Sequence, residues 1–328
     1  DLNGNIYLSS LEGIFKIDTE KQYSLFAGSD TGVAGDLDGP KLNARFRLIS
    51  GLVFANPSRL VVVDMDAFKV KEIHEDMVRT IAGTGRPGLK DGLWLEASFS
   101  SPDHVAVCGE TIIVSDGERK LRLLLSNGLT QTLRMKDTFP DICNVSAYTS
   151  CSLLVGGDNT LHRLDLGTQK TELLATRDQR IDGDFQFFST SKTGDVYVSW
   201  PLHDSISKIL PNGSRVQVLG RDTHGAILGI PEFLRVECIR PTANCISSNG
   251  YIWWTEPTGI MRYQKLQPEH GPLIAWDERE QPGFFEWKSL QNGVSDFNLT
   301  HARSSRVISL NGSVLQLWGA DLQKIAAL

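Results

Sequence analysis

Short apolar runs of four to six residues recur along the chain, separated by glycine, proline and charged residues. Residues 59–64, 68–73 and 78–83 form one such series, in which apolar side chains alternate with polar ones or continue without a break. This periodicity is typical of β-strands, and no long segment repeats its apolar positions with the period of a helix. The pattern therefore predicts an all-β protein.

A pair of neighbouring strands recurs through the sequence at regular intervals. The first strand of each pair is expected at residues 5–8, 60–63, 111–115, 152–156, 195–199, 251–255 and 306–309, at spacings of 41 to 56 residues. A four-stranded sheet of this size cannot bury both of its faces alone and must pack radially against its neighbours. We therefore expect one β-propeller domain over residues 1–328, with four-stranded blades.

The strand count predicts seven blades, although two features complicate it. The first strand of the first blade should precede Asp1, so either a C-terminal segment completes that blade or the chain is a fragment. An irregular stretch at residues 267–282 marks an insertion within residues 265–300 and keeps six blades as an alternative.

Five landmarks repeat along the chain at offsets of 52 to 55 residues. The matched positions are Ala27-Gly28 with Ala82-Gly83, Asp38-Gly39 with Asp91-Gly92, Ala44 with Ala97, Phe46 with Phe99, and Asp64 with Asp116. The glycines permit the positive φ that tight loops require. We expect Phe46 and Phe99 to lock each glycine-rich loop under the strand that follows.

These segments resemble a known repeat. Residues 35–46 and 91–102 look like the NHL repeat, and residues 1–8 resemble the Asp-x-x-Gly-Asn-Leu-Tyr-Val strand of the same family. The resemblance is clear over residues 1–125 and weaker beyond them. It implies a β-propeller, usually six-bladed, that binds proteins or RNA and that in related propellers carries out chemistry.

Composition narrows the range of functions. The 328 residues carry a formal charge of −6, which argues against binding to nucleic acid driven by net charge. Basic and acidic residues are interleaved, as in residues 177–182, which is typical of a solvated surface. No apolar run is long enough to span a membrane.

The cysteines and glycosylation motifs favour an extracellular or secretory-lumenal location. Two close pairs, Cys143 with Cys151 and Cys238 with Cys245, could form disulfides or remain reduced in the core. Asn-x-Ser/Thr motifs occur at Asn144, Asn212, Asn298 and Asn311. The chain shows no targeting segment, and its start at Asp1 favours a processed product or a fragment.

Three residues are the candidates for a metal site. Asp64 and Asp116 each end a strand and could contribute to a ring of Ca²⁺ ligands, and His104 near the axis could bind Zn²⁺. The favoured alternative is that both aspartates cap turns and pair with a basic residue nearby, at Lys69 or Lys71 and at Lys120 or Arg122. No local set of catalytic residues is present, and we expect no cofactor.

The densest aromatic region predicts a binding rim. Its members are Trp253, Trp254, Trp276, Phe284, Phe285 and Trp287. Packing between blades is the alternative, and a rim would bind a protein or a glycan.

The function that the sequence favours is recognition: a non-enzymatic scaffold whose loop face binds another protein. A metal-assisted lyase or lactonase with its site in the central channel is the alternative. An RNA-binding module is a third hypothesis, and it would require a clustered positive face.

Overall fold

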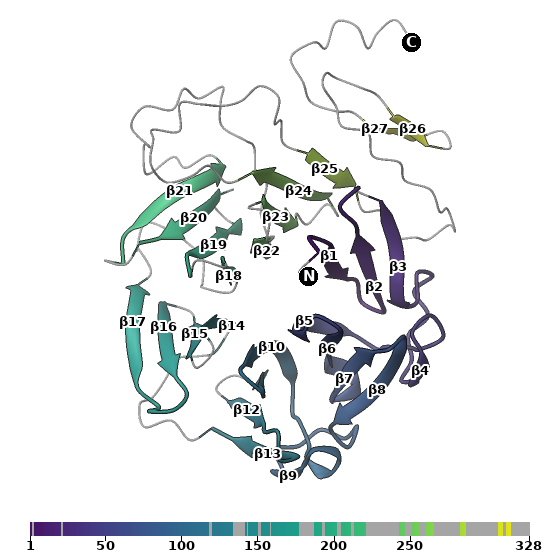
Figure 1. Ribbon diagram of the computed structural model, residues 1–328, viewed down its shortest axis with the longest axis vertical. Helices are drawn as coiled ribbons and strands as arrows, with labels where there is room; N and C mark the ends of the chain where they lie inside the picture. The colour runs from purple at the N-terminus through teal and green to yellow at the C-terminus, as the bar shows by residue number, and fades with distance from the viewer. Residues whose placement is uncertain are drawn as a thin grey trace, which may run out of the picture.

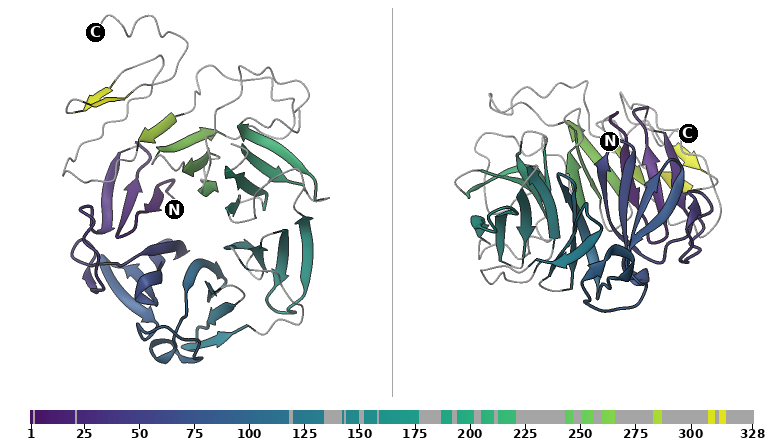
Figure 2. Two further views of the ribbon diagram at one scale, coloured as in Figure 1. Left: turned by 180° about the vertical axis from the view of Figure 1, so that it is seen from behind. Right: turned by 60° about the horizontal axis from the view of Figure 1, so that its bottom comes forward.

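Sheets arranged in a ring around a central axis form the molecule in the computed structural model (Figure 1). The described residues are 1, 3–20, 22–117, 120–133, 142, 144–149, 152–157, 159–176, 187–191, 194–201, 205–210, 213–220, 243–246, 251–255, 260–265, 283–286, 308–310 and 313–315. Seen from behind, the sheets follow one another around the ring in chain order (Figure 2). No helix within these residues is long and apolar enough to cross a membrane.

The first three sheets contain the clearest repeats. Sheet 1 has three strands, β1 (Ile6–Ser9), β2 (Gly13–Ile17) and β3 (Tyr23–Gly28). Sheet 2 has five strands, β4 (Gly39–Pro40), β5 (Ile49–Asn56), β6 (Arg59–Asp64), β7 (Lys69–His74) and β8 (Met77–Ala82), with the 3-10 helix η1 (Met65–Ala67) after β6. Sheet 3 repeats this plan with β9 (Gly92–Leu93), β10 (Pro102–Cys108), β11 (Thr111–Asp116), β12 (Leu121–Leu124) and β13 (Leu129–Thr132), and the 3-10 helix η2 (Trp94–Glu96) follows β9.

The next three sheets are antiparallel and four-stranded. Sheet 4 comprises β14 (Asn144–Thr149), β15 (Ser152–Gly156), β16 (Thr160–Asp165) and β17 (Thr171–Thr176). Sheet 5 comprises β18 (Phe188–Thr190), β19 (Val196–Trp200), β20 (Ser205–Ile209) and β21 (Arg215–Gly220). Sheet 6 comprises β22 (Ala243–Ile246), β23 (Tyr251–Thr255), β24 (Ile260–Lys265) and β25 (Gly283–Glu286).

The all-β propeller fold is confirmed, but the count of seven four-stranded blades is wrong. Within the described part of the chain, five sheets have four or five strands, whereas sheet 1 has three. The last predicted unit contains only the pair β26 (Ile308–Leu310) and β27 (Ser313–Leu315), which lies outside the ring (Figure 1). The count failed because the sequence pattern marks a pair of strands in each unit and does not show whether the other strands of the blade are present.

Apolar side chains between neighbouring sheets form the core. Phe46 and Leu60 belong to the cluster between sheets 1 and 2, and Phe99 and Val114 to the cluster between sheets 2 and 3. The ring closes where Trp253 of β23 packs with Ile6 of β1 and Ile17 of β2. The first and the last sheet of the ring, sheets 1 and 6, therefore share one apolar cluster.

Two long loops have the same local structure in sheets 2 and 3. We call residues 29–48 and 84–101 the anchored loops. In the first, the Gly35 N–H donates to the carbonyl of Phe46 (3.0 Å), and in the second the Gly88 N–H donates to the carbonyl of Phe99 (3.0 Å). Each loop also contributes a two-residue strand, β4 or β9, that pairs with the outermost strand of its sheet, β8 or β13. The sequence pattern missed these strands because two residues show no periodicity.

The locking role of the two phenylalanines is consistent with their burial. Phe46 and Phe99 are both 0% exposed. Each ring lies against the glycine at which its loop begins: a Cβ at Gly28 would meet the Phe46 ring at 3.0 Å, and one at Gly83 would meet Phe99 at 3.2 Å. Both glycines also have positive φ, 87° and 99°. A side chain at either position would be strained and would displace the ring.

Phe46→Ala and Phe99→Ala are each expected to lower the free energy of unfolding by about 3 to 5 kcal/mol, because each leaves a cavity in a core between sheets. Urea denaturation followed by tryptophan fluorescence measures the effect. Leu95→Ala is the control, since Leu95 is 61% exposed. Changes near zero at both phenylalanines would show that they do not lock the loops.

Candidate binding surface

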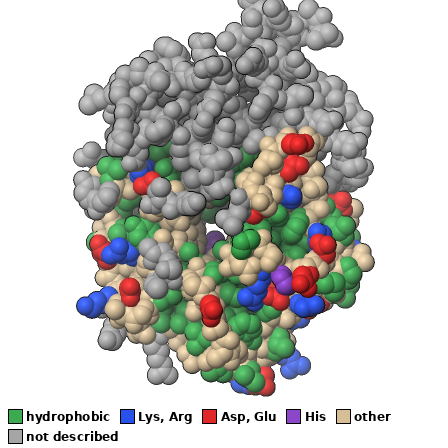
Figure 3. Space-filling model, viewed as in Figure 1, with side chains coloured by type: hydrophobic (Ala, Val, Ile, Leu, Met, Phe, Trp, Pro, Cys, Tyr) green, Lys and Arg blue, Asp and Glu red, His purple; other side chains and the backbone are tan. Residues whose placement is uncertain are grey.

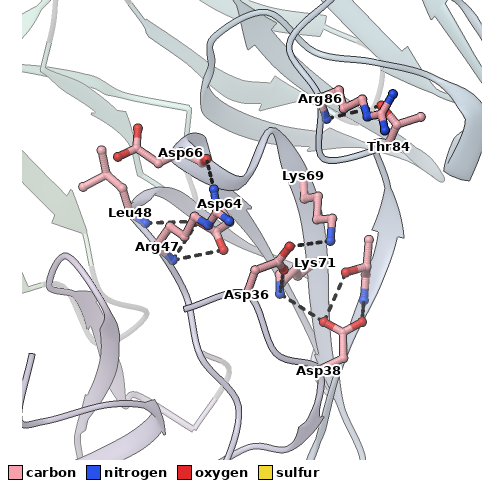
Figure 4. Close-up of polar contacts among 11 residues, drawn as sticks. Asp36, Asp38, Arg47, Leu48, Asp64, Asp66, Lys69, Lys71, Thr84 and Arg86 are labelled. Carbon is pink, nitrogen blue, oxygen red and sulfur yellow. Dashed lines mark hydrogen bonds and ion pairs between the residues drawn. The ribbon is translucent and has the colours of Figure 1, made fainter. Parts of the chain in front are cut away.

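A buried lysine holds the first anchored loop against sheet 2. Lys71, on β7, has a side chain that is 0% exposed, and its Nζ lies 2.7 Å from a carboxylate oxygen of Asp36 and 3.0 Å from one of Asp38 (Figure 4). Asp38 also accepts a hydrogen bond from the backbone N–H of Thr80 on β8 (2.7 Å). Burying an unpaired ammonium group costs a large free energy, so displacing the two loop aspartates from Lys71 would strongly destabilise the fold.

An arginine does the same work in sheet 3. Arg122 of β12 is 0% exposed, with its Nη2 3.0 Å from Asp91 of the second anchored loop and its Nη1 2.9 Å from Asp116. The same nitrogens donate to the carbonyls of Ser98 (2.8 Å) and Lys90 (2.9 Å). The planar fork of donors suits this set of acceptors, three from the second anchored loop and one, Asp116, from the end of β11.

The strand-end aspartates fix the other end of each anchored loop. Asp64 is 0% exposed and accepts from the backbone N–H groups of Arg47 (3.1 Å) and Leu48 (3.0 Å). Asp116 accepts from those of Ser100 (2.7 Å) and Ser101 (2.8 Å). The predicted cap of the turn after each strand is replaced by a cap on the end of the preceding loop. Of the basic partners that the sequence left open, Arg122 contacts Asp116 directly, whereas Lys69 and Lys71 pair with aspartates of the first anchored loop and not with Asp64.

The three candidate metal ligands are not brought together. Asp64 and Asp116 lie in different sheets, and His104, on the innermost strand β10, has its Nε2 3.4 Å from Asp103. No group of three or more His, Cys, Asp or Glu residues in the described ranges could hold a metal ion. A hollow is visible near the axis in Figure 3, but no ligand set among these residues surrounds it.

The pKa shift differs in direction between the partly exposed loop aspartates and the buried strand-end Asp64. Burial alone would raise the pKa of Asp38 and of Asp91, but hydrogen bonds from Thr80 and Lys71, and from Thr132 and Arg122, outweigh it and hold both pKa values below the ordinary range. Burial raises the pKa of Asp64, against the hydrogen bonds from Leu48 and Arg47 and the charge of Lys71. The loop carboxylates are therefore ionised at neutral pH.

The anchored loops expose large apolar side chains. Nine such residues are exposed within the described ranges, and six of them lie on these loops: Val33 (51%), Leu37 (55%), Leu42 (53%), Leu89 (42%), Leu93 (52%) and Leu95 (61%). Figure 3 shows apolar side chains among polar ones on this margin of the molecule, over sheets 2 and 3. The sequence analysis missed this surface, although Leu42 and Leu95 match at the repeat offset of 53 residues.

The predicted aromatic rim is wrong for the two tryptophans of β23. Trp253 is 2% exposed and closes the ring, and Trp254 is 0% exposed in the cluster between sheets 5 and 6. Packing between sheets, the alternative interpretation, accounts for both. Phe284 and Phe285 lie on β25, but their side chains are not among those described. Trp276 and Trp287 lie outside the described residues.

One of the two predicted disulfides is also wrong. Cys245 is a free cysteine, and burial raises the pKa of its thiol to about 11, so it stays protonated. Cys245 lies on β22 opposite Trp253, inside the sheet and not at the base of a small closed loop. Its predicted partner Cys238, and the other pair, Cys143 and Cys151, lie outside the described residues.

The glycosylation motifs remain predictions. Asn144 begins β14, the first strand of sheet 4, and is half-buried. Asn212, Asn298 and Asn311 lie outside the described residues.

Arg122→Met is expected to lower the free energy of unfolding by about 3 to 5 kcal/mol, because it leaves Asp116 buried without its cation. Thermal or urea denaturation measures the loss. Arg163→Met is the control: its ion pair with Glu172 has side chains that are 43% and 56% exposed, so its loss should cost less than about 1 kcal/mol. Equal small effects at both sites would contradict an anchoring role for Arg122.

The anchoring of both loops is expected to weaken in acid. Because the pKa values of Asp38 and Asp91 in the folded protein lie below the unfolded value of about 3.9, their contribution to stability is complete above that pH and is lost as the pH falls through the folded values. NMR should show the amide protons of Thr80 and Thr132, which donate to these carboxylates, shifting only below about pH 4.

The Leu129 amide is the control for this titration, because it donates to the side chain of Asn127, which does not titrate (3.1 Å). Asp38→Asn should abolish the transition at Thr80 and leave that at Thr132. A Thr80 amide that shifts in the same way in this variant would show that another group causes the change.

Comparisons with known proteins bear on the fold alone. No family model matches the chain, and no curated protein matches it. Among solved structures, a chain of a nidogen/laminin complex matches with a TM-score of 0.57 at 11% identity, over 80% of this chain and 89% of that one. Virginiamycin B lyase from Staphylococcus aureus matches with a TM-score of 0.54 at 9% identity, over 89% and 84% of the two chains.

A candidate gluconolactonase also matches, with a TM-score of 0.54 at 13% identity, over 77% of this chain and 82% of that one. Identities this low indicate a shared architecture and carry no statement about activity. The chain is a β-propeller, and its structural neighbours include both a protein complex and enzymes.

Proposed function

We propose that the protein is a non-enzymatic recognition scaffold that binds another protein through its two anchored loops. The observation that carries the proposal is that six of the nine exposed large apolar side chains in the described ranges lie on these loops. Exposed apolar side chains that gather on two neighbouring loops are the kind of surface that a binding site uses. Trp253 and Trp254 of the predicted rim are buried and cannot serve such a surface.

Rigidity makes these loops suitable for binding. Each loop is held at one end by an aspartate that accepts hydrogen bonds from backbone N–H groups. Its middle is held by a buried cation of the adjoining sheet, Lys71 on β7 or Arg122 on β12. A loop that is already ordered loses little conformational entropy when a partner binds, so more of the contact energy appears as affinity. The repeated landmarks also support membership of the NHL-type propellers, which we propose on the resemblance of residues 1–125.

The enzyme alternative has its support in the structural neighbours and not in a site. It requires ligands around the axis, and the described residues hold no such group. Elemental mass spectrometry separates the two functions: about one tightly bound zinc or calcium ion per chain would favour the metal-assisted enzyme. An extracellular or lumenal location is proposed on the glycosylation motifs alone.

Leu42→Ser with Leu95→Ser is expected to weaken partner binding about tenfold or more, because buried apolar anchors dominate interfaces. Binding proteins are captured from an extract on the immobilised wild-type protein, identified and purified, and their affinities are measured by calorimetry. Leu173→Ser on β17 is the matched control, since Leu173 is 52% exposed on sheet 4. Partners that bind the double variant as tightly as the wild type would refute the proposal.

A further inference from the structure

The acidic side chains of the anchored loops are largely neutralised within the protein. Asp36 pairs with Lys69 (2.6 Å) and Lys71, Asp38 with Lys71, and Asp91 with Arg122. These three aspartates are committed to holding the loops. Each has a cation within 3.0 Å, although the side chains of Asp38 and Asp91 are 42% and 49% exposed.

The basic side chains of the same loops are in a different situation. Arg45, Arg47, Arg86 and Lys90 have no carboxylate partner in the part of the chain that the structure describes. The Arg45 guanidinium donates to the carbonyls of Leu42 (3.4 Å) and Ala44 (2.7 Å), and that of Arg47 to the carbonyl of Asp66 (3.4 Å). Backbone carbonyls orient these groups without neutralising them.

Most of the charged loop side chains that lack an ion pair among the described residues are cations. Lys41 pairs with Asp76, and the loop acids without an ion pair among the described residues are Asp30 and Glu96. Four cations without an ion pair in the described ranges therefore stand against two such carboxylates. The two loops together carry five basic and five acidic residues, and Arg122 also pairs with Asp116, so the excess is one of unpaired side chains and not of net charge. The screening length is about 8 Å at physiological ionic strength, so these four side chains can attract the carboxylates of a molecule docked on the loops.

The cations lie beside the exposed apolar residues. Arg45 is the cross-strand partner of Leu37 in an isolated bridge, and its guanidinium reaches the carbonyl of Leu42. Lys90 follows Leu89, and its backbone is held by Ser98 and Arg122. Each anchored loop thus presents apolar and cationic groups together, on backbone that the buried cation fixes.

We propose that the anchored loops recognise a protein segment that is both acidic and apolar, with leucine-like side chains spaced among carboxylates. This inference rests on the proposed function and specifies the partner's chemistry. Nucleic acid is the less favoured ligand, because single strands are held mainly by stacking on exposed aromatic rings. Trp94, the tryptophan of these loops, is half-buried and uses its Nε1 to donate to the carbonyl of Leu129 (3.2 Å).

The test uses a fluorescently labelled amphipathic peptide of leucine and glutamate, with glutamine-for-glutamate and lysine-for-glutamate peptides as comparisons. Anisotropy titrations of the full chain at low and high salt should show the glutamate peptide binding more tightly than the glutamine peptide, with an affinity that falls as salt rises. Arg45→Glu with Lys90→Glu should weaken its binding about tenfold, because each reversal replaces an attraction to the peptide's carboxylates with a repulsion.

Lys170→Glu is the matched control, because Lys170 is an exposed cation on sheet 4 away from the loops. Each variant is checked for an unchanged denaturation midpoint. A glutamate peptide that binds no more tightly than the glutamine or lysine peptide, or that tolerates both charge reversals, would overturn the inference.

Two further outcomes separate this inference from the proposed function. Leucine-dependent binding of all three peptides, lost in Leu42→Ser with Leu95→Ser, would leave the recognition surface standing and refute its acidic preference. Binding of single-stranded RNA that requires Arg45 and Lys90, with no binding of the glutamate peptide, would overturn both in favour of a nucleic-acid surface.

Discussion

The loop surface depends on the ion pairs between a buried cation, on β7 or β12, and the aspartates of the adjoining anchored loop. Lys71 and Arg122 occupy equivalent places in sheets 2 and 3, and each is 0% exposed. A charge in that position is tolerated only with carboxylates beside it. The anchored loop supplies Asp36 and Asp38 to Lys71, and it supplies Asp91 to Arg122, which also pairs with Asp116 of β11. The pairing of one buried cation therefore helps to fix the path of the whole anchored loop.

The phenylalanine below each cation completes the arrangement. The Lys71 Nζ lies 5.6 Å from the centre of the Phe46 ring, and the Arg122 guanidinium carbon lies 5.1 Å from that of Phe99. Each ring has a cation over its face. It also packs against a glycine, Gly28 or Gly83, whose missing side chain leaves room for the ring. Apolar packing and charge pairing thus restrain the same loop, and the leucines of that loop can stay exposed without collapsing onto the sheet.

Different parts of the molecule hold the ring together and carry the exposed apolar side chains. The apolar clusters between sheets hold the ring together and close it at Trp253, while the loops outside the ring carry the exposed apolar and cationic groups. Asp36, Asp38 and Asp91 pair with cations of sheets 2 and 3. The basic residues of the same loops other than Lys41 have no carboxylate partner among the described residues.

The sequence alone determined the features that depend on local periodicity. The strands can be predicted from the alternation of apolar and polar residues. The equivalence of Phe46 and Phe99 can be predicted because the landmarks around them recur at offsets of 52 to 55 residues. The tertiary structure decided the rest: the number of complete blades, the burial of Trp253 against Ile6, and the choice of Lys71 as the partner of Asp38, 33 residues away. These depend on which segments meet around the ring, and a local pattern carries no information about contacts between distant segments.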